Sequence, residues 1–282
     1  MSASNQTLTT LARAKINLTL HVGAAQNDGY HPLHSLVLFA DIGDELSASA
    51  AREFSLKIDG PFANGLSSGP DNFVLKSANK LAKTKSNLGK LAYKLTKNLP
   101  IASGIGGGSA DAAAAVNLLL SENDETTNVL LEIGADVPVC YLSRTCIMEG
   151  IGEELTPLPG LGQVAAILVN PGVAVSTGAI FQSFDKGGTS SEFALPSGTL
   201  LEMARAGRND LQDTAIGITP VIQTVLDEIE AQQNCQLARM SGSGATCFGL
   251  FETLEDAQNA SAVIKSKYPD WWCVPTMLGD MP

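Results

Sequence analysis

A run of closely spaced glycines near the middle of the chain has the composition of a phosphate site. Gly104, Gly106, Gly107 and Gly108 precede Ser109 and an alanine-rich apolar run. Glycine can adopt positive φ and lets the backbone approach a ligand closely. Serine is a favoured helix N-cap, so we expect a helix to open at Ser109 with its positive end at the loop. A glycine loop that leads into a helix N-terminus binds phosphate through its backbone N–H groups.

Two common nucleotide motifs do not match this loop. The P-loop requires Gly-Lys-Ser/Thr at its end, and no lysine follows Gly108. The dinucleotide fingerprint requires a third glycine where the chain has Ser109. A tight turn between a strand and a helix remains an alternative. Three consecutive glycines cost much chain entropy for a turn alone, so the sequence favours phosphate binding.

A lysine and an aspartate elsewhere in the chain could supply charge and proton transfer. Lys15 and Asn17 are two residues apart in an alternating stretch, which places them on one face of a strand. Asp136 lies between Gly134 and Pro138, which predict a helix stop and a non-helical segment. A carboxylate can act as a general base and an ammonium can stabilise developing negative charge. Taken alone, a solvated lysine and a turn aspartate explain these residues as well.

Three stretches together resemble a known kinase superfamily. Residues 100–113, with Gly-Ile-Gly-Gly-Gly-Ser-Ala-Asp-Ala-Ala at their end, resemble the phosphate-binding motif of the galactokinase, homoserine kinase, mevalonate kinase and phosphomevalonate kinase superfamily. Ala-Lys-Ile-Asn-Leu at 14–18 with Asp-Gly-Tyr-His at 28–31, and Gly-Ala-Asp-Val-Pro at 134–138, are similar to motifs of one branch. That branch comprises the kinases of the non-mevalonate isoprenoid route. The resemblance spans residues 14–251.

The resemblance implies an ATP-dependent kinase that phosphorylates a hydroxyl of a small molecule carrying cytidine diphosphate. ATP and Mg²⁺ are the implied cofactors, with Ser109 near the metal ion. Asp136 would accept the proton of the attacking hydroxyl, and Lys15 would hold Asp136 and stabilise the transferring phosphate. Phosphoryl transfer asks a protein chiefly for positioning and charge stabilisation, which suits these residue types.

The same resemblance implies two groups of binding residues. Tyr30 and Phe181 would stack on the cytosine base and His31 would bond its polar edge, although a histidine near a hairpin turn also has a structural explanation. Gly178 stands where relatives often have proline, and the connection at 121–127 is shorter than is usual in the family. The implied substrate-binding residues are Asn17, Tyr30, His31 and Phe181. The implied ATP-binding residues are Asn72, Lys97, Pro100, Ile101, Ala102, Ser103, Gly104, Ile105, Gly106, Gly107, Gly108 and Ser109.

Hydrophobic periodicity predicts the elements that position these residues. Residues 11–22 alternate, which predicts a half-buried strand whose polar face carries Lys15. Asp71-Asn72 predicts the start of a helix, and the alternating residues 91–96 form a strand that leads to Lys97 and the glycine loop. Further along, strands are expected at 164–170, 237–240, 246–251 and 272–277, and helices at 177–184, 220–232 and 254–267.

The chain is expected to form an α+β fold of two domains. Prolines and glycines cluster at 157–162 and suggest a boundary there. Residues 1–160 would form the ATP-binding domain, for which the resemblance implies a fold like that of ribosomal protein S5. Residues 161–282 would form a ferredoxin-like domain on the substrate side. Ser-Gly-Ser-Gly-Ala-Thr at 241–246 resembles the C-terminal glycine motif of the superfamily, with a hairpin turn as the alternative.

Composition limits the possible partners and surroundings. The net charge of −11 argues against nucleic acid and anionic membranes, so an anionic substrate needs local donors. The five cysteines are odd in number and widely spaced, which supports neither a disulfide framework nor a zinc site. No signal peptide or membrane-spanning run is visible. We expect a cytoplasmic protein, a monomer or weak homodimer, that binds a small-molecule substrate.

Two other functions stay open on the sequence. One is a different kinase of the superfamily, of the mevalonate or homoserine type. Some of those kinases lack the catalytic aspartate, so Asp136 counts against them. The other is a nucleotide-binding regulator without catalysis, which would have no need of Lys15 together with Asp136.

Overall fold

The computed structural model describes residues 7–26, 30–85, 88–120, 127–187 and 194–280. Contacts divide the chain into two compact units, each described here by itself. Strands β1 (Leu8–Asn17) and β3 (Leu33–Ala51) contribute residues to both units. The domain boundary expected near residue 160 stays a prediction. Unit 1 is Met1–Ala14, Ile42–Ile101 and Gly106–Ser143, and unit 2 is Lys15–Asp41, Ala102–Ile105 and Arg144–Pro282.

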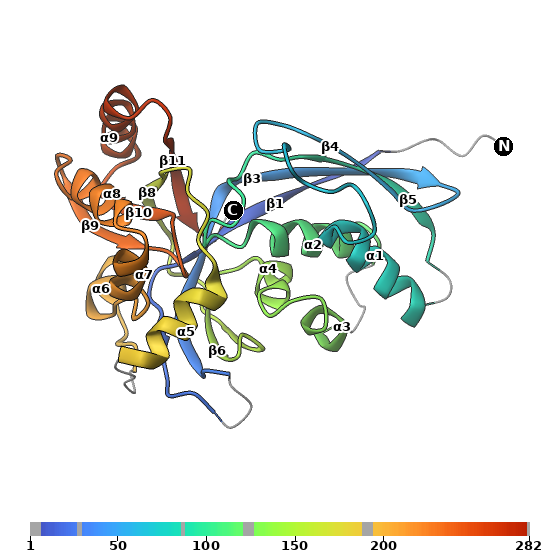
Figure 1. The fold of residues 1–282 in the computed structure, drawn as a ribbon, viewed down its shortest axis with the longest axis horizontal. Coiled ribbons are helices and arrows are strands. Elements are labelled where there is room, and N and C mark those ends of the chain that lie inside the picture. The colour runs from blue at the N-terminus through green and yellow to red at the C-terminus, as the bar shows by residue number, and fades with distance from the viewer. Residues whose placement is uncertain (1–6, 27–29, 86–87, 121–126, 188–193, 281–282) are drawn as a thin grey trace. The chain divides into compact units, whose positions relative to one another are not determined.

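Unit 1 combines a small sheet with helices. The parallel pair β4 (Ser55–Asp59) and β5 (Lys90–Thr96) adjoins the end of β3, which runs antiparallel to β5. Helices α1 and α2 lie along one face of these strands (Figure 1). The helices of this unit are α1 (Phe73–Thr84), α2 (Gly107–Asn117), α3 (Thr127–Leu131) and α4 (Val137–Leu142).

Helix α1 begins where its capping signal predicts. The Asn72 side chain accepts a hydrogen bond from the Val74 N–H at 3.0 Å, which satisfies one of the first-turn donors. Val74, Leu75, Ala78 and Leu81 form the buried stripe with helical spacing. This amphipathic pattern confirms the helix expected after Asp71-Asn72.

Helix α2 begins three residues earlier than expected. It starts at Gly107 with Gly106 as the N-cap, so Ser109 lies inside its first turn and is not the cap. Gly106 has φ of 67°, a left-handed conformation that glycine adopts without steric cost. The helix is buried along its whole middle, and its small alanine side chains permit close packing against α1 and α4.

Unit 2 is an antiparallel sheet with helices packed on it. The strand order is β3-β11-β8-β10-β9, and α8 and α9 contact its strands (Figure 1). This arrangement confirms the α+β class. The strands are β2 (His21–Val22), β6 (Cys146–Gly150), β7 (Glu154–Pro157), β8 (Gln163–Asn170), β9 (Cys235–Met240), β10 (Cys247–Phe251) and β11 (Trp272–Gly279). The helices are α5 (Thr177–Gly187), α6 (Leu200–Ala206), α7 (Gln212–Ile218), α8 (Val221–Glu230) and α9 (Leu254–Lys267).

The polar face of the first strand is buried, contrary to expectation. Lys15, Asn17, Thr19 and His21 are all at most 4% exposed. The chain before α7 covers part of this face, since a Cβ at Gly207 would lie only 2.4 Å from Thr19 Cγ2. The strand also breaks after Asn17 and resumes at His21, because the backbone between them bonds to other segments of unit 2.

All five cysteines are free thiols, and burial raises the pKa of Cys146 to about 12, which keeps that thiol protonated and unreactive. Across the described part of the chain, no helix has both the length and the apolar character needed to cross a membrane.

Candidate active site

The first turn of α2 offers the backbone donors that the glycine loop predicts. Ala110 N–H is bonded to Gly106 C=O at 2.8 Å. The N–H groups of Gly107, Gly108 and Ser109 belong to the first turn, where a helix provides no partner within itself. Together with the helix dipole, these donors can bind an anionic phosphate group.

In unit 2, the second glycine motif lies against the first part of the loop. Thr246 N–H donates to Ser103 C=O at 3.1 Å, and the Ser241 hydroxyl donates to Gly104 C=O at 3.2 Å. A Cβ at Gly104 would lie 2.5 Å from the Ser241 carbonyl oxygen, and one at Gly242 would lie 2.7 Å from the Gly104 oxygen. Glycine is therefore needed on both sides, because the two backbones touch.

The end of β1 lies beside both glycine segments of unit 2. Lys15 N–H donates to Ile105 C=O at 2.9 Å, and Asn17 N–H donates to the Ser241 hydroxyl at 3.1 Å. The Asn17 Nδ2 group donates to the Ser35 hydroxyl at 2.8 Å. Within the described residues the buried Asn17 Oδ1 has no hydrogen-bond partner, so it can accept a bond from a ligand.

Lys97 has two carboxylate partners that the sequence did not reveal. Its Nζ bonds Asp44 of β3 and lies 2.7 Å from Asp111 Oδ2 of α2, and none of the three residues is more than 4% exposed. Burial raises the pKa of Asp111 to about 7. The two carboxylates raise the pKa of Lys97, against the opposing effect of burial. Lys97, the cation expected just before the glycine loop, is thus buried in unit 1 and bonded to two carboxylates. No local signal singles out Asp44, because β3 also contains Asp41 and Glu45 beside it.

Asp136 lies at the start of a helix, although the sequence predicts a non-helical segment there. The structure has α4 beginning at Val137 with Asp136 as its N-cap, φ −83° and ψ −5°, and no side-chain bond to the helix end. Pro138 is in the first turn, where proline is tolerated because its missing N–H has no helical partner. The proline therefore helps to start a helix and does not prevent one. The Asp136 side chain is half-buried.

In unit 2, His31 and Phe181 come together from distant parts of the chain. Their ring centroids are 5.4 Å apart at an interplanar angle of 34°. His31 Nδ1 lies 2.8 Å from the Gly23 carbonyl oxygen, and Nε2 lies 2.8 Å from Asp185 Oδ1. Nδ1 therefore has a hydrogen-bond partner, whereas the buried Nε2 lies near a carboxylate oxygen but makes no hydrogen bond within the described residues. Asp185 was missed, although its place four residues after Phe181 on α5 puts both on one helix face.

The other predicted residues fall in one unit or the other. Tyr30 is 58% exposed, and the turn expected before it at 27–29 lies outside the described residues, as does most of the connection at 121–127. Asn72, Lys97, Pro100, Ile101, Gly106 to Ser109 and Asp136 belong to unit 1, whereas Lys15, Asn17, Tyr30, His31, Ala102 to Ile105 and Phe181 belong to unit 2.

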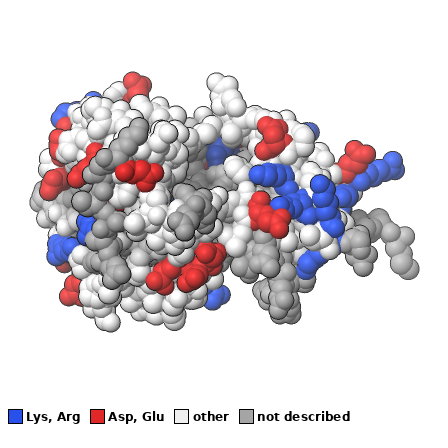
Figure 2. All heavy atoms as spheres, turned by 60° about the horizontal axis from the view of Figure 1, so that its bottom comes forward, with Lys and Arg blue, Asp and Glu red and all other residues white. Residues whose placement is uncertain are grey.

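Charge is distributed unevenly over the sequence. Residues 52–97 contain nine Lys and Arg but only three Asp and Glu, in a chain of net charge −11. Figure 2 shows Lys and Arg side chains gathered over the part of unit 1 that contains α1, which carries Lys76, Lys80 and Lys83. This local excess favours an anionic ligand at unit 1.

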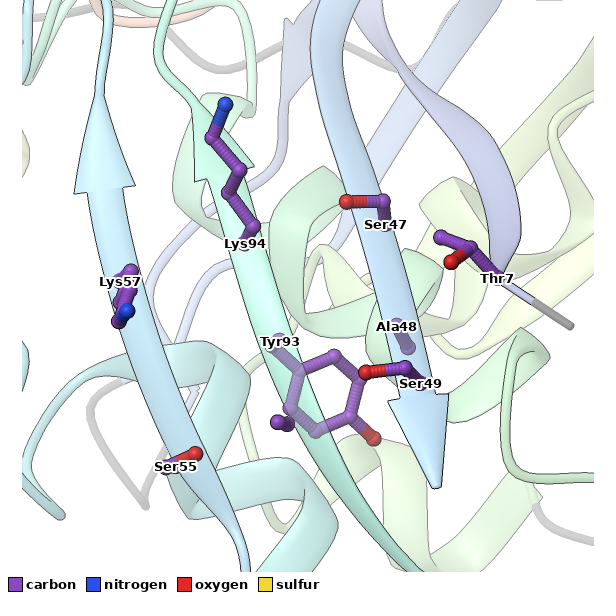
Figure 3. Close-up of a pocket in the computed structure, with 9 residues that line it drawn as sticks. Thr7, Ser47, Ala48, Ser49, Ser55, Lys57, Tyr93 and Lys94 are labelled. Atoms are coloured by element: carbon purple, nitrogen blue, oxygen red, sulfur yellow. The ribbon is translucent and has the colours of Figure 1, made fainter. Parts of the chain in front are cut away.

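A separate hollow lies on the strands of unit 1. Ser47, Ser49 and Ser55 line it together with Lys57 and Lys94 (Figure 3). Lys94 is bonded to Asp59 at 2.9 Å. None of the predicted site residues lines this hollow.

Sequence comparisons identify close relatives of the whole chain. The profile of the GHMP kinases N terminal domain matches residues 72–146, and that of the GHMP kinases C terminal region matches residues 194–270. A protein of Roseobacter denitrificans named 4-diphosphocytidyl-2-C-methyl-D-erythritol kinase is 46% identical, over 97% of this chain and 94% of its own length. A protein of Parvibaculum lavamentivorans with the same name is 43% identical, over 94% and 96%.

Solved structures agree with the sequence relatives. A crystal structure of 4-(cytidine 5'-diphospho)-2C-methyl-D-erythritol kinase superposes with a TM-score of 0.81 and 29% identity, over 97% of this chain and all of that one. Homoserine kinase from Cytophaga hutchinsonii, at 15% identity and a TM-score of 0.68 over 98% of this chain and 96% of that chain, shares the fold. The chain therefore belongs to the 4-diphosphocytidyl-2-C-methyl-D-erythritol kinase family within the GHMP kinases.

Proposed function

We propose that the protein transfers the γ-phosphoryl group of ATP to the 2-hydroxyl of 4-diphosphocytidyl-2-C-methyl-D-erythritol, in the non-mevalonate route to isoprenoid precursors. The observation that carries the proposal is the first turn of α2, which presents the N–H groups of Gly107, Gly108 and Ser109 beside a loop of glycines. The names of the near full-length relatives support the choice of substrate.

In this proposal Asp136 accepts the proton of the attacking hydroxyl while the oxygen attacks the γ-phosphorus. Lys15 stabilises the negative charge that develops on the alkoxide and the transferring phosphate. The first-turn amides of α2 hold the nucleotide phosphates so that the attacking and leaving oxygens are in line. The remaining ATP contacts are assigned to Asn72 and to residues 100–109.

Mg²⁺ fits the donor set of this chain as a phosphate-bound ion. The Ser109 hydroxyl is an oxygen donor of the kind that Mg²⁺ accepts. Within the described ranges there is no group of three or more His, Cys, Asp or Glu side chains able to hold a metal ion. In this proposal Ser109 would supply one ligand to the ion and the ATP phosphates most of the others. When bound, the ion neutralises phosphate charge.

We assign the binding of the cytidine moiety to the aromatic residues Tyr30, His31 and Phe181 of unit 2. Phe181 packs on His31, whose Nδ1 lies 2.8 Å from the Gly23 carbonyl oxygen. A cytosine base stacked between Tyr30 and Phe181 would gain ~1–3 kcal/mol. Because the buried Nε2 of His31 has no hydrogen-bond partner among the described residues, we assign it a bond to the polar edge of the base. Asn17 Oδ1 is the proposed acceptor for a substrate hydroxyl.

One assay separates this function from its alternatives. ADP release from ATP is measured with the cytidine-containing substrate, with mevalonate, with homoserine and with no acceptor. We expect release only with the cytidine-containing substrate. Turnover of mevalonate or homoserine would indicate another kinase of the family, and ATP binding without turnover of any acceptor would indicate a regulator.

A further inference from the structure

Unit 1 contains a buried cluster of one lysine and two aspartates. Lys97 Nζ is bonded to Asp44 and lies 2.7 Å from Asp111 Oδ2, and the three residues are 3%, 0% and 4% exposed. An ammonium ion with two buried carboxylate partners cannot leave them cheaply, because each would remain as an unpaired buried charge. The proposed reaction has so far given Asp44 and Asp111 no role.

The cluster joins three segments of unit 1. The Asp44 carboxylate on β3 also accepts the N–H groups of Asn98 at 2.6 Å and Leu99 at 2.8 Å, so it holds the chain that leaves β5. Lys97, in that same chain, reaches Asp111 on α2. Strand β3, the segment after β5 and helix α2 are therefore tied together by charged hydrogen bonds, which are stronger than neutral ones.

The cluster lies directly against the start of α2. A Cβ at Gly107, the first residue of the helix, would be 3.2 Å from Lys97 Nζ and 3.8 Å from Asp44 Oδ2. Asp111 is four residues further on, about one helical turn. The lysine thus bonds a side chain of the second turn and lies next to the space that a side chain at the first helical residue would occupy.

We propose that Asp44, Lys97 and Asp111 are positioning residues that hold the first turn of α2, and that Lys97 affects ATP binding through this cluster rather than by contact with phosphate. The inference rests on the proposed function, because it assumes that the first-turn N–H groups bind ATP.

Replacement of Asp111 distinguishes the two roles of Lys97. In D111A the lysine loses the bond that connects it to α2, so we expect the Kd for ATP to rise at least ~10-fold, which corresponds to about 1.4 kcal/mol of binding free energy. D111N keeps an oxygen that can accept from Lys97 and should lose less affinity. If Lys97 contacts phosphate, D111A releases the ammonium toward the ligand. An unchanged or lower Kd for ATP in D111A would therefore overturn the inference.

A matched control excludes general destabilisation. The Tyr93 hydroxyl on β5 donates to Ala115 C=O at the far end of α2, at 3.3 Å, and is also buried. Y93F should lower the denaturation midpoint and leave the Kd for ATP unchanged. If Y93F weakens ATP binding as much as D111A does, the effect is one of stability and the positioning role is wrong.

A double variant provides a second comparison. K97M leaves two buried carboxylates without their cation, whereas K97M/D111N leaves only Asp44, which keeps its two backbone donors. The double variant should regain most of the denaturation midpoint and of the ATP affinity lost in K97M. If the double variant regains the denaturation midpoint but not the ATP affinity, Lys97 itself contacts the phosphate and the inference is wrong. Failure of the unchanged protein to bind ATP would instead refute the proposed function, and this inference with it.

Discussion

At the scale of single residues, the two candidate catalytic side chains occupy very different surroundings. Lys15 is 4% exposed at the end of β1, with its N–H bonded to Ile105. Asp136 is half-buried at the N-terminus of α4, where its side chain makes no capping bond to the helix.

The first prediction concerns this pair. Asp136→Asn and Lys15→Ala should each lower kcat by at least ~10²-fold, the range for lost acid–base catalysis, with little change in ATP affinity. The double variant should lose less than the product of the two effects, because the residues act on one step. Steady-state kinetics checks the prediction, with circular dichroism to confirm folding. A kcat near the wild-type value for Asp136→Asn would remove that residue from the mechanism.

His21 carries the second prediction, which concerns pH. Burial lowers its pKa to about 4, with Asp210 opposing the shift. The unfolded chain, with a histidine pKa of about 6.5, takes up a proton first as the pH falls. The stability due to the neutral buried ring is therefore present above pH ~6.5 and lost as the pH falls toward ~4.

The variant His21→Gln removes this titration. Between pH 7 and pH 5 the wild-type free energy of unfolding should fall by about 2 kcal/mol more than that of the variant. Urea denaturation at several pH values measures the difference. Parallel stability profiles for the two proteins would mean that His21 does not titrate differently on folding.

At the scale of elements, the contact between the two glycine segments of unit 2 carries the third prediction. Gly104 and Gly172 have nearly the same φ, 76° and 78°, but only Gly104 has other backbone within reach of an added Cβ. Gly104→Ala and Gly172→Ala therefore share the cost of a left-handed alanine, about 1–2 kcal/mol. They differ because only the Gly104→Ala side chain would clash with the backbone atoms of Ser241 and Gly244.

We expect Gly104→Ala to lose a further ~1–3 kcal/mol of unfolding free energy, as overpacked sites do. Chemical denaturation of both variants measures the difference, because Gly172→Ala controls for backbone strain. Equal losses would indicate that the second glycine motif does not press on Gly104 in solution.

At the scale of the whole molecule, each unit contains residues that are assigned to the proposed reaction. The first turn of α2 and Asp136 belong to unit 1, and Phe181 with His31 belongs to unit 2. Binding energy gained at the cytidine end of the substrate can position its distant hydroxyl, so it affects kcat as well as KM.

The fourth prediction tests this use of remote binding. Methylerythritol 4-phosphate lacks the cytidine monophosphate portion and should show a lower kcat/KM than the full substrate, by about 5- to 150-fold for one stacked base. Phe181→Ala should lower kcat/KM for the full substrate but leave the truncated one unchanged. Comparable values for both substrates in the wild-type protein would exclude the cytidine site.

Much of the fold was open to prediction because its signals are local. Helix α9 follows its periodicity and occupies the expected residues, 254–267. Asn72 caps α1 through a bond to a residue two positions away, which any reading of the sequence can anticipate. The glycine loop and the kinase family were likewise recognisable, since each motif on which they depend is a run of consecutive residues.

The tertiary structure alone decided which of the remaining residues meet. Lys97 finds Asp44 across 53 residues, and Asn17 meets Ser241 across 224, so no local pattern reports either contact. The polar face of β1 is buried because distant segments cover it. Helix α2 starts early because Gly106, in a left-handed conformation, takes the N-cap position that was expected for Ser109. Sequence thus determined the elements and the chemistry available, while packing between distant segments determined which charges are held and which backbones touch.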